Sequence, residues 1–329
     1  MYNSYKIHCI DIGGRGGPDE SLRPIANMVH WTVVEPDPDE CKRISRAGDH
    51  GFASVRTIST AIGSYSAPAI HTSTVEADLQ QTAPRRLRLY RQRGCSSLYE
   101  ADTSRAARYD RDGYYILDGE VDVQLQGLDE ALYREDKDYS YLKIDIQGAE
   151  LEAFTTGPHL LSQLVMVRCE VSFLPIYKSQ PLFADISAFM MESGFELLRF
   201  VEQHHWRRNS RTKYPRVAGN GVSSVGQLIH GDALFVRSPE SLIGTGPKAG
   251  TKLLDLAFLA YAYGDVDLAI AALNTDDAVS TFETFRKEQN ETVKELIKWM
   301  VTGTRNRQRK GRLKAYAREV LEYLRGARV

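Results

Sequence analysis

Short apolar runs that end at glycine, proline or acidic residues recur along the first two thirds of the chain. Parallel strands buried on both faces have this continuous apolar pattern, whereas half-exposed strands alternate apolar and polar residues. A half-exposed strand of the alternating type fits residues 120–126. We predict core strands at residues 7–12, 31–35, 55–63, 141–146, 164–173, 195–201 and 233–238.

Segments with helical signals lie between these strands. Residues 18–30 begin with Pro-Asp-Glu, which favours a helix start because proline fits the first turn and carboxylates stabilise the positive end of the helix dipole. The alternation predicts an α/β fold, a Rossmann-like doubly wound sheet of seven mostly parallel strands. The predicted helices are residues 18–30, 38–47, 128–135, 147–157 and 181–194.

Residues 64–140 and the C-terminal third depart from this alternation. The first segment is too long for a plain connection, so we expect extra strands or a lid there. After a Gly/Pro/Ser-rich linker at residues 238–250 the pattern is all helical, with a hairpin at 253–273 that turns at Gly264-Asp265 and helices at 277–301 and 312–325. We therefore expect an α/β domain at residues 1–240 and a C-terminal all-helical extension at residues 251–329, serving partner interaction, lid closure or homodimer formation.

The amino-acid composition argues against several classes of protein. The 329 residues carry 42 Lys+Arg and 43 Asp+Glu, a formal charge of -1, which argues against nucleic-acid binding driven by overall charge. The four cysteines form no close pair, so neither a disulfide framework nor a zinc knuckle is indicated. No apolar run approaches the length of a membrane span, and we expect a cytoplasmic protein.

A glycine loop, Asp11-Ile-Gly-Gly-Arg-Gly-Gly17, follows the first strand. Glycines allow a tight turn and close approach to a ligand, whose anionic part we expect to meet free N–H groups at the following helix. The third position of a dinucleotide fingerprint is Asp19, so that motif fails. Glu35 ends the second strand, where an acidic residue accepts hydrogen bonds from ribose hydroxyls. A nucleoside site is favoured over a structural glycine turn with a capping glutamate.

Motifs along residues 7–237 resemble those of the FkbM-type S-adenosylmethionine-dependent methyltransferases. The most specific is YLKIDIQGAELEAF at 141–154, and IDIGGRGG, VVEPDP, AIG, GCSSLYEAD and LDEAL also match. The resemblance implies a class I methyltransferase fold, S-adenosylmethionine as cofactor, S-adenosylhomocysteine as product, and SN2 methyl transfer to a hydroxyl of a sugar, glycan or secondary metabolite.

The resemblance also assigns cofactor contacts. The methionine part would lie on the glycine loop, the ribose at Glu35 and the adenine at Ala61-Ile62, with Asp145 at the cofactor or substrate edge. Arg15 departs from the Asn or His often found at its position, and it would bind the cofactor carboxylate or cap a neighbouring loop. The implied loop contacts are Asp11, Gly13, Gly14, Arg15 and Gly17.

Candidate catalytic groups follow the predicted strands. Ligands bind at the carboxyl ends of strands in such sheets, which favours Asp145, Glu170 and the pair His204-His205. Asp145 would otherwise cap the helix that follows, Glu170 would pair with Arg168 or Lys143, and the histidines would lie in a solvated loop. Carboxylates at 145, 150 and 170 would suit magnesium, but such groups are equally common without a metal, and we predict none.

Three basic clusters oppose the neutral total and keep two other hypotheses open. Phosphate contacts by these clusters would suit an RNA-modifying methyltransferase, and a non-catalytic scaffold would keep the fold without turnover. The small-molecule O-methyltransferase is the favoured hypothesis. The clusters are Arg85, Arg86, Arg88, Arg91 and Arg93; Arg207, Arg208, Arg211, Lys213 and Arg216; and the nine Lys/Arg from Arg305 to Arg328.

Overall fold

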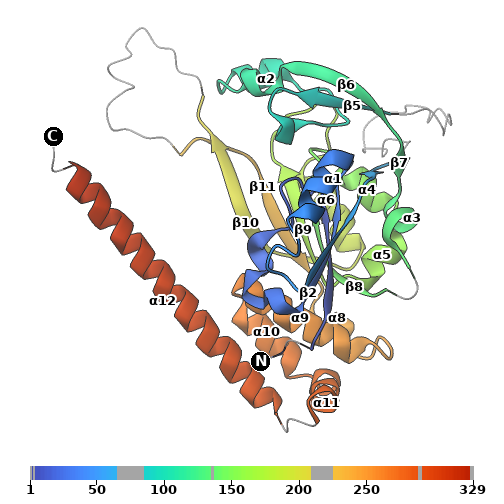
Figure 1. The fold of residues 1–329 in the computed structure, drawn as a ribbon, viewed down its shortest axis with the longest axis vertical. Coiled ribbons are helices and arrows are strands. Elements are labelled where there is room, and N and C mark those ends of the chain that lie inside the picture. The colour runs from blue at the N-terminus through green and yellow to red at the C-terminus, as the bar shows by residue number, and fades with distance from the viewer. Residues whose placement is uncertain are drawn as a thin grey trace. The chain divides into compact units, whose positions relative to one another are not determined.

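The chain forms two compact units in a computed structural model (Figure 1). One unit comprises Met1–Glu20 and Ala26–Ser238, and the other comprises Ser21–Ile25 and Pro239–Val329. The structure describes residues 2, 4–64, 85–134, 137–208, 225–287 and 291–326, with side chains described as far as residue 310.

The first unit is built on a seven-stranded sheet. β11 is antiparallel to both of its neighbours, while all other neighbouring strands run parallel, which confirms the predicted doubly wound α/β sheet. The order across the sheet is β10 (Glu196–Trp206), β11 (Gln227–Val236), β9 (Met166–Ser172), β8 (Tyr139–Ile144), β1 (Ile7–Ile12), β2 (Val29–Val34) and β3 (Ser54–Ile58).

Helices cover the sheet, and its buried strands form the core. Ile10, Leu142 and Val167 from three neighbouring strands are fully buried, and Phe154 stacks on Phe189 between two covering helices. This apolar packing holds the strand ends in fixed positions. The covering helices are α1 (Pro38–Arg46), α3 (Leu128–Leu132), α4 (Glu150–Thr155), α5 (Pro158–Gln163) and α6 (Phe183–Glu192).

Two predicted helices in this unit differ from the structure. Residues 18–30 contain a 3-10 segment, η1 (Glu20–Met28), with Pro24 inside it and Ile25 outside helical geometry, because proline cannot continue an α-helix. The predicted helix at 147–157 is α4, which begins later, at Glu150, and ends at Thr155 before Gly157 as expected; α5, which starts with Pro158 at the first helical position, was not predicted.

Three predicted strands also have different bounds. β3 ends at Ile58, and Ala61–Ile62 form a separate short strand, β4, paired with β7 (Leu125–Gln126). β10 and β11 extend well beyond 195–201 and 233–238, because each provides the other with an antiparallel partner. His204 and His205 therefore lie within β10 rather than in a loop.

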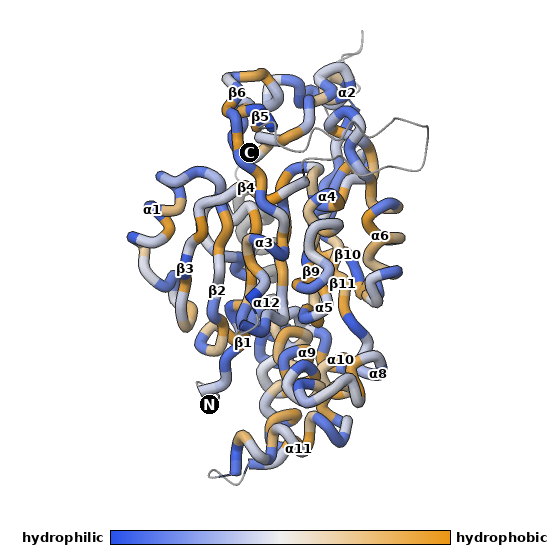
Figure 2. The backbone as a smooth tube through the Cα atoms, turned by 90° about the vertical axis from the view of Figure 1, so that its right-hand side faces the viewer, coloured by the Kyte–Doolittle hydropathy of each residue, from blue (hydrophilic) through white to orange (hydrophobic). Residues whose placement is uncertain are grey.

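A small subdomain, here called the cap, comprises residues 85–123. β5 (Arg85–Tyr90) and β6 (Leu117–Val123) form an antiparallel hairpin that holds η2 (Arg93–Cys95), α2 (Thr103–Ala107) and η3 (Asp112–Tyr115). Figures 1 and 2 both show the cap beyond the carboxyl ends of the parallel strands. Within the cap, the Tyr115 ring packs edge to face on the Tyr90 ring, and it makes the same kind of contact with Tyr177 outside the cap. The cap supplies the extra strands expected for residues 64–140.

The second unit is helical, and Figure 2 shows apolar stretches along α9 and α10. Gly264 ends α9 with a φ of 87°, which confirms the predicted hairpin turn. No helix of the described residues is long and apolar enough to cross a membrane. The helices are α8 (Pro239–Leu242), α9 (Ala249–Tyr263), α10 (Val266–Leu273), α11 (Asp276–Phe285) and α12 (Val293–Gly326).

The predicted helices at 277–301 and 312–325 are wrong in their bounds. α11 ends at Phe285, and α12 is one helix of 34 residues. Its start has a local cause, because the Glu295 carboxylate accepts a hydrogen bond from Thr292 N at 2.8 Å in the manner of a capping box. Gly303 lies inside α12 because a Cβ there would meet the Tyr261 hydroxyl at 2.1 Å.

Arg168 of β9 links three parts of the first unit through ion pairs. Its guanidinium lies 3.0 Å from Asp19 Oδ1 and 2.5 Å from Asp232 Oδ2, and its side chain is 8% exposed. A third carboxylate, Glu202 Oε1, lies 3.3 Å away. Arg168 thus pairs with these residues rather than with Glu170, the alternative left open by the sequence.

Arg168→Met tests this network by leaving partly buried carboxylates without their cation. We expect the free energy of unfolding to fall by about 3 to 5 kcal/mol, measured by urea denaturation. Lys178→Met is the matched control, since Lys178 and Glu100 form an exposed pair whose loss costs about 1 kcal/mol or less. Equal losses in the two variants would contradict the assignment.

Candidate active site

The glycine loop after β1 packs directly against the end of β8. Gly13 has a φ of 75°, and a Cβ there would lie 1.9 Å from the Asp145 carbonyl oxygen. A Cβ on Gly14 would lie 2.5 Å from Val33 Cγ1 at the end of β2. Gly17 also has positive φ, 120°. Only glycine allows this contact between three strand ends.

The backbone donors of this loop are largely used within the protein. Gly13 N donates to Val34 O, Gly17 N to Gly14 O, and Gly16 N to Glu40 Oε1 at 2.7 Å. The N–H of Asp19 donates to Asp11 Oδ2 at 2.9 Å. The expectation of free N–H groups for an anion is therefore wrong for these positions, because the loop closes on itself and η1 is not a regular helix.

Acceptor atoms are what the loop offers instead. Asp11 is buried, and no hydrogen bond reaches its Oδ1 from the described residues, although Lys143 Nζ lies 3.3 Å away. Burial raises the pKa of Asp11 to about 6 against the opposing effect of Lys143. The loop is thus suited to a cationic or hydroxyl donor.

Glu35 stands beside the loop at the end of β2. Its Oε1 accepts a hydrogen bond from Asp37 N, and its Oε2 has none with any residue that the structure describes. Arg15 Nη1 lies 3.9 Å from Glu35 Oε1 and 3.7 Å from Asp37 Oδ2, so Arg15 points toward these acids. Burial raises the pKa of Glu35.

Lys143 and Asp145 lie at the carboxyl end of β8, in the middle of the sheet edge that carries the site. Lys143 Nζ lies between Asp11 and Asp145, 3.9 Å from Asp145 Oδ2. Although burial opposes its charge, the two carboxylates raise the pKa of Lys143. Although burial also opposes ionisation of Asp145, Lys143 and hydrogen bonds from Glu170 and Gln147 lower the pKa of that carboxyl. Asp145 is not the cap of α4, whose N-cap residue is Ala149.

The turn after β8 is clamped by Glu150. Gln147 and Gly148 have positive φ, 55° and 104°. The Glu150 carboxylate accepts hydrogen bonds from Ile146 N at 2.8 Å and Gly148 N at 3.0 Å, which hold this conformation. Burial, with a contribution from nearby Asp145, raises the pKa of Glu150 to about 7.

Gln147 joins the acidic residues through its side-chain amide. Its Nε2 donates to Asp145 Oδ1 and to Glu170 Oε2, each at 2.7 Å. Burial and the neighbouring carboxylates of Asp145 and Glu150 raise the pKa of Glu170. The raised pKa of Glu170 and the lowered pKa of Asp145 favour a proton held between the two side chains on the Glu170 side, and Gln147 bridges the pair.

Two histidines on the antiparallel strands complete this group. His230 Nδ1 lies 3.2 Å from Glu170 Oε1, and its ring stacks on that of His204 with centroids 4.4 Å apart. Burial and His204 lower the pKa of His230 to about 4. The His205 side chain makes no hydrogen bond, ion pair or ring contact with the residues that the structure describes, and its backbone pairs with Leu228 of β11.

His230 is the residue that sequence reasoning missed. The predicted strand at 233–238 excluded it, and the antiparallel register that pairs His230 with His204 and Ser172 is set by distant segments. A weak signal existed in the alternation of His230 and Asp232 with Ile229 and Ala233, which is typical of a strand with one polar face.

The cap contacts the same turn. Ser97 Oγ of the cap donates to Gln147 O at 2.7 Å. Tyr177, which lies outside the cap, has its hydroxyl 2.9 Å from Gln147 Oε1 and 2.7 Å from Cys95 O of the cap. Glu152, buried in α4, binds both Arg85 and Tyr99 of the cap. The GCSSLYEAD and IDIQGAELE motifs are therefore in contact.

Carboxylates of β6 neutralise much of the cap's basic cluster. Arg86 and Arg88 lie 3.2 and 3.4 Å from Glu120, and Arg93 lies 2.5 Å from Asp118. Of the second cluster, Arg208 lies over the Tyr109 ring, whereas Arg211, Lys213 and Arg216 lie outside the described residues. The side chains of the tail beyond residue 310 are also outside them.

Asp145, Glu150 and Glu170 each place one oxygen within 4.8 Å of the others. That spacing would suit a divalent cation, but Glu150 is already held by two backbone N–H groups and Glu170 by Gln147 and His230. These contacts fix the positions of the Glu150 and Glu170 carboxyl groups within the cluster.

Known proteins that are similar to this chain are methyltransferases. The sequence pattern described as the methyltransferase FkbM domain matches residues 23–197. No curated protein matches the chain in sequence. Magnesium protoporphyrin IX methyltransferase (ChlM) from Synechocystis PCC 6803 with bound SAM aligns at 12% identity over 71% of each chain, with a TM-score of 0.33. The 23S rRNA methyltransferase ErmE aligns at 12% identity over 77% of this chain and 82% of its own, with a TM-score of 0.29.

Glu150→Gln tests the clamp through the pH dependence of stability. The native state keeps a proton on Glu150 up to about pH 7, whereas the unfolded chain loses it near the ordinary pKa of 4.5. Wild-type stability should therefore fall as the pH rises through this window, and the variant should show a smaller fall. Urea denaturation at a series of pH values measures the slope.

Glu192→Gln provides the control for that slope, because Glu192 is an exposed residue at the end of α6. Its pH dependence should equal that of the wild type. A Glu150→Gln slope as steep as the wild-type slope would show that Glu150 is ionised in the folded protein.

Proposed function

Since this chain belongs to the FkbM methyltransferase family, we propose that it transfers the methyl group of S-adenosylmethionine to a hydroxyl oxygen of a sugar, glycan or secondary-metabolite acceptor. The sheet has the strand order of class I methyltransferases. The observation that carries the proposal is a pair of carboxylate oxygens that accept no hydrogen bond from the described residues, Asp11 Oδ1 and Glu35 Oε2, beside a loop in which Gly13 and Gly14 have no room for a side chain.

These carboxylate oxygens suit two donor groups of the cofactor, the amino group of its methionine part and the hydroxyls of its ribose. We propose that Asp11, with the backbone of Gly13, Gly14 and Gly17, receives the amino group, because the loop offers oxygens rather than free N–H donors. Glu35 receives the ribose hydroxyls. Ala61 and Ile62 of β4 provide an apolar surface for the adenine, and Ile62 is buried in the core.

Arg15 acts beside this site as a counter-charge in the proposal. It faces Glu35 and Asp37, so it keeps two acids from repelling each other near the ribose position. This arrangement favours the loop-capping alternative for Arg15 over a contact with the cofactor carboxylate.

The cofactor would supply a methyl group on a positively charged sulfonium. The protein's contribution is to align the acceptor oxygen with that methyl, an effect worth up to about 7 to 11 kcal/mol in well-oriented reactions. Asp145, 36% exposed in its side chain, lies at the substrate edge in our proposal and accepts a hydrogen bond from a second hydroxyl of the acceptor, beside the one that reacts. Glu170 and His204 form the neighbouring wall.

The alternative functions have less support. The cap arginines are paired with β6 carboxylates, which leaves fewer cations to contact RNA phosphates. For the two-domain division at 1–240 and 251–329 we propose catalysis by the first part and homodimer formation through the helices of the second. A non-catalytic scaffold would differ from both by lacking cofactor binding or turnover.

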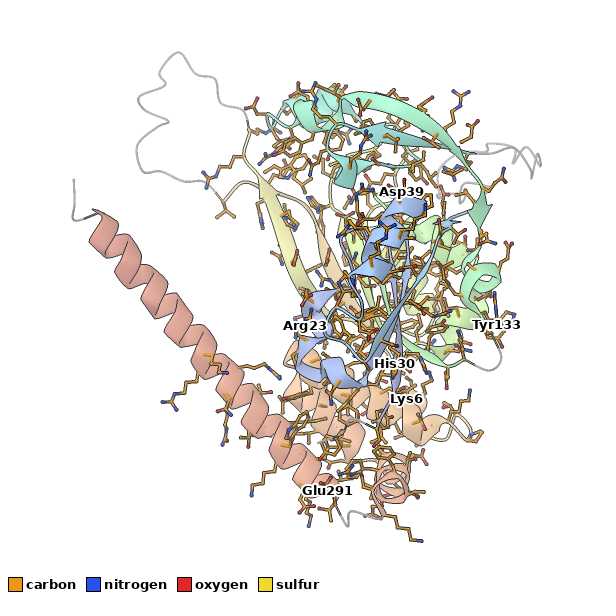
Figure 3. The ribbon with its side chains drawn as sticks, viewed as in Figure 1. Lys6, Arg23, His30, Asp39, Tyr133 and Glu291 are labelled. Carbon is orange, nitrogen blue, oxygen red and sulfur yellow. The ribbon has the colours of Figure 1, made fainter. Side chains whose placement is uncertain are left out.

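Glu35→Ala tests the cofactor site by isothermal titration calorimetry with S-adenosylmethionine. Loss of a hydrogen bond to a charged group should weaken binding by roughly ten- to a hundredfold. Asp39→Ala is the matched control. Asp39, which is labelled in Figure 3, is an exposed acid of α1, and among the described residues its side chain pairs with Lys42 alone. Titration with NAD should show no binding.

Two other outcomes of the titration would contradict parts of the proposal. Absence of S-adenosylmethionine binding by the wild type would contradict the proposed cofactor. Equal affinities of Glu35→Ala and wild type would remove Glu35 from the site while leaving the cofactor itself supported.

A further inference from the structure

Methylation of a hydroxyl releases a proton, and the acidic edge needs a group to receive it. The O–C bond forms as the C–S bond breaks with its electron pair passing to sulfur, and the O–H proton must leave the acceptor oxygen. We infer that His230 receives this proton on Nε2 and that Glu170 is the positioning residue that orients its ring. This inference rests on the proposed methyl transfer to oxygen.

The position of His230 fits the role. β11 runs antiparallel to its neighbours, so the beginning of this strand lies at the edge where the parallel strands end. The His230 side chain is 21% exposed, close to Glu170 from β9 and, through Glu170, to Asp145 at the end of β8. His230 is thus partly accessible while its ring is held by the protein.

The contact with Glu170 selects the useful tautomer. Glu170 Oε1 lies 3.2 Å from His230 Nδ1, and this contact favours the tautomer with its hydrogen on Nδ1, which leaves the lone pair on Nε2. The other groups that hold Glu170 are Gln147, which donates to Oε2, and Asp145, which shares the Glu170 proton. These three contacts fix the carboxyl that orients the imidazole.

Neighbouring rings hold the imidazole plane. His204 stacks on it at 4.4 Å, and Trp206 meets it edge to face at 6.0 Å. The charged and titratable groups around His230 are Glu170, His204, Asp145 and Glu202. Burial and His204 outweigh the two acids Asp145 and Glu202, so the imidazole is neutral at neutral pH and has an empty site for a proton.

Other candidates are less suitable as acceptors of this proton. Glu170 already holds a proton, and the oxygens of Asp145 face Lys143 and Gln147. His204 is 48% exposed and its Nε2 lies 3.5 Å from Glu202. A neutral imidazole of low basicity is sufficient, because the acceptor oxygen becomes strongly acidic as its bond to the methyl carbon forms.

His230→Asn is the direct test, since the Asn side-chain amide keeps a donor for Glu170 but has no counterpart of Nε2. The probe is S-[methyl-³H]adenosylmethionine with a mixture of the methyl glycosides of glucose, mannose and rhamnose. We expect single-turnover methyl transfer to fall by about a hundredfold or more, with S-adenosylmethionine affinity unchanged by calorimetry. Transfer within threefold of the wild type would overturn the inference.

His159→Asn is the matched control. His159 lies on α5 beside Tyr133 (labelled in Figure 3), with the two rings 5.4 Å apart, and it has no part in the site. It should retain wild-type transfer. A second variant, His230→Gln, separates loss of the base from loss of folding. We expect His230→Asn and His230→Gln to lower methyl transfer to the same extent, while both keep the melting temperature of the wild type in thermal unfolding.

Nitrogen-15 NMR of the histidine rings gives a readout that needs no acceptor. We expect His230 to show a protonated Nδ1 and a bare Nε2 from about pH 5.5 to 8, identified by the signal lost in His230→Asn. Protonation of Nε2 in this range would overturn the inference. The Glu170→Gln variant should weaken the preference between tautomers without abolishing cofactor binding.

These measurements separate the inference from the function on which it rests. A wild type that binds S-adenosylmethionine but methylates none of the glycosides would contradict the sugar acceptor, and the NMR tautomer would then decide the role of His230. A wild type that binds no S-adenosylmethionine would contradict the proposed function itself, whatever the tautomer.

Discussion

The close contact between Gly13 and the Asp145 carbonyl is the constraint on which the rest of the site depends. A side chain at Gly13 would occupy the position of that carbonyl, so the loop after β1 reaches the end of β8 only with glycine there. This contact brings Asp11 and Asp145 to opposite sides of one lysine, Lys143. The geometry of the strand ends thereby determines the electrostatics of the edge.

Lys143 cannot neutralise every acid near it, and the remaining charge is removed by protonation. Lys143 lowers the pKa of Asp145 and so favours its ionised form, whereas burial and the neighbouring acids raise the pKa values of Glu150 and Glu170 and so favour their protonated forms. Gln147 links these groups without adding charge. The result is a polar edge that combines an ionised acid, a neutral acid and a neutral imidazole, which suits proton movement during chemistry at a hydroxyl group.

The cap adds a second set of constraints at the same turn. Ser97 and Tyr177 hold Gln147, and Arg85 and Tyr99 reach the buried Glu152. Any shift of the cap would therefore displace the residue that bridges Asp145 and Glu170. The arginines of β5 mainly balance the acids of β6, so their number in the sequence overstated the basic surface of the cap.

The sequence by itself determined the parallel core, the glycine loop and the placement of Glu35, Asp145 and Glu170 at strand ends, because buried strands and tight turns are encoded by consecutive residues. Only the tertiary structure decided the lengths of β10 and β11 and the place of His230. Those features depend on antiparallel pairing and packing between distant segments. Local periodicity carries no information about register with a partner strand, and that register is what places His230 against Glu170.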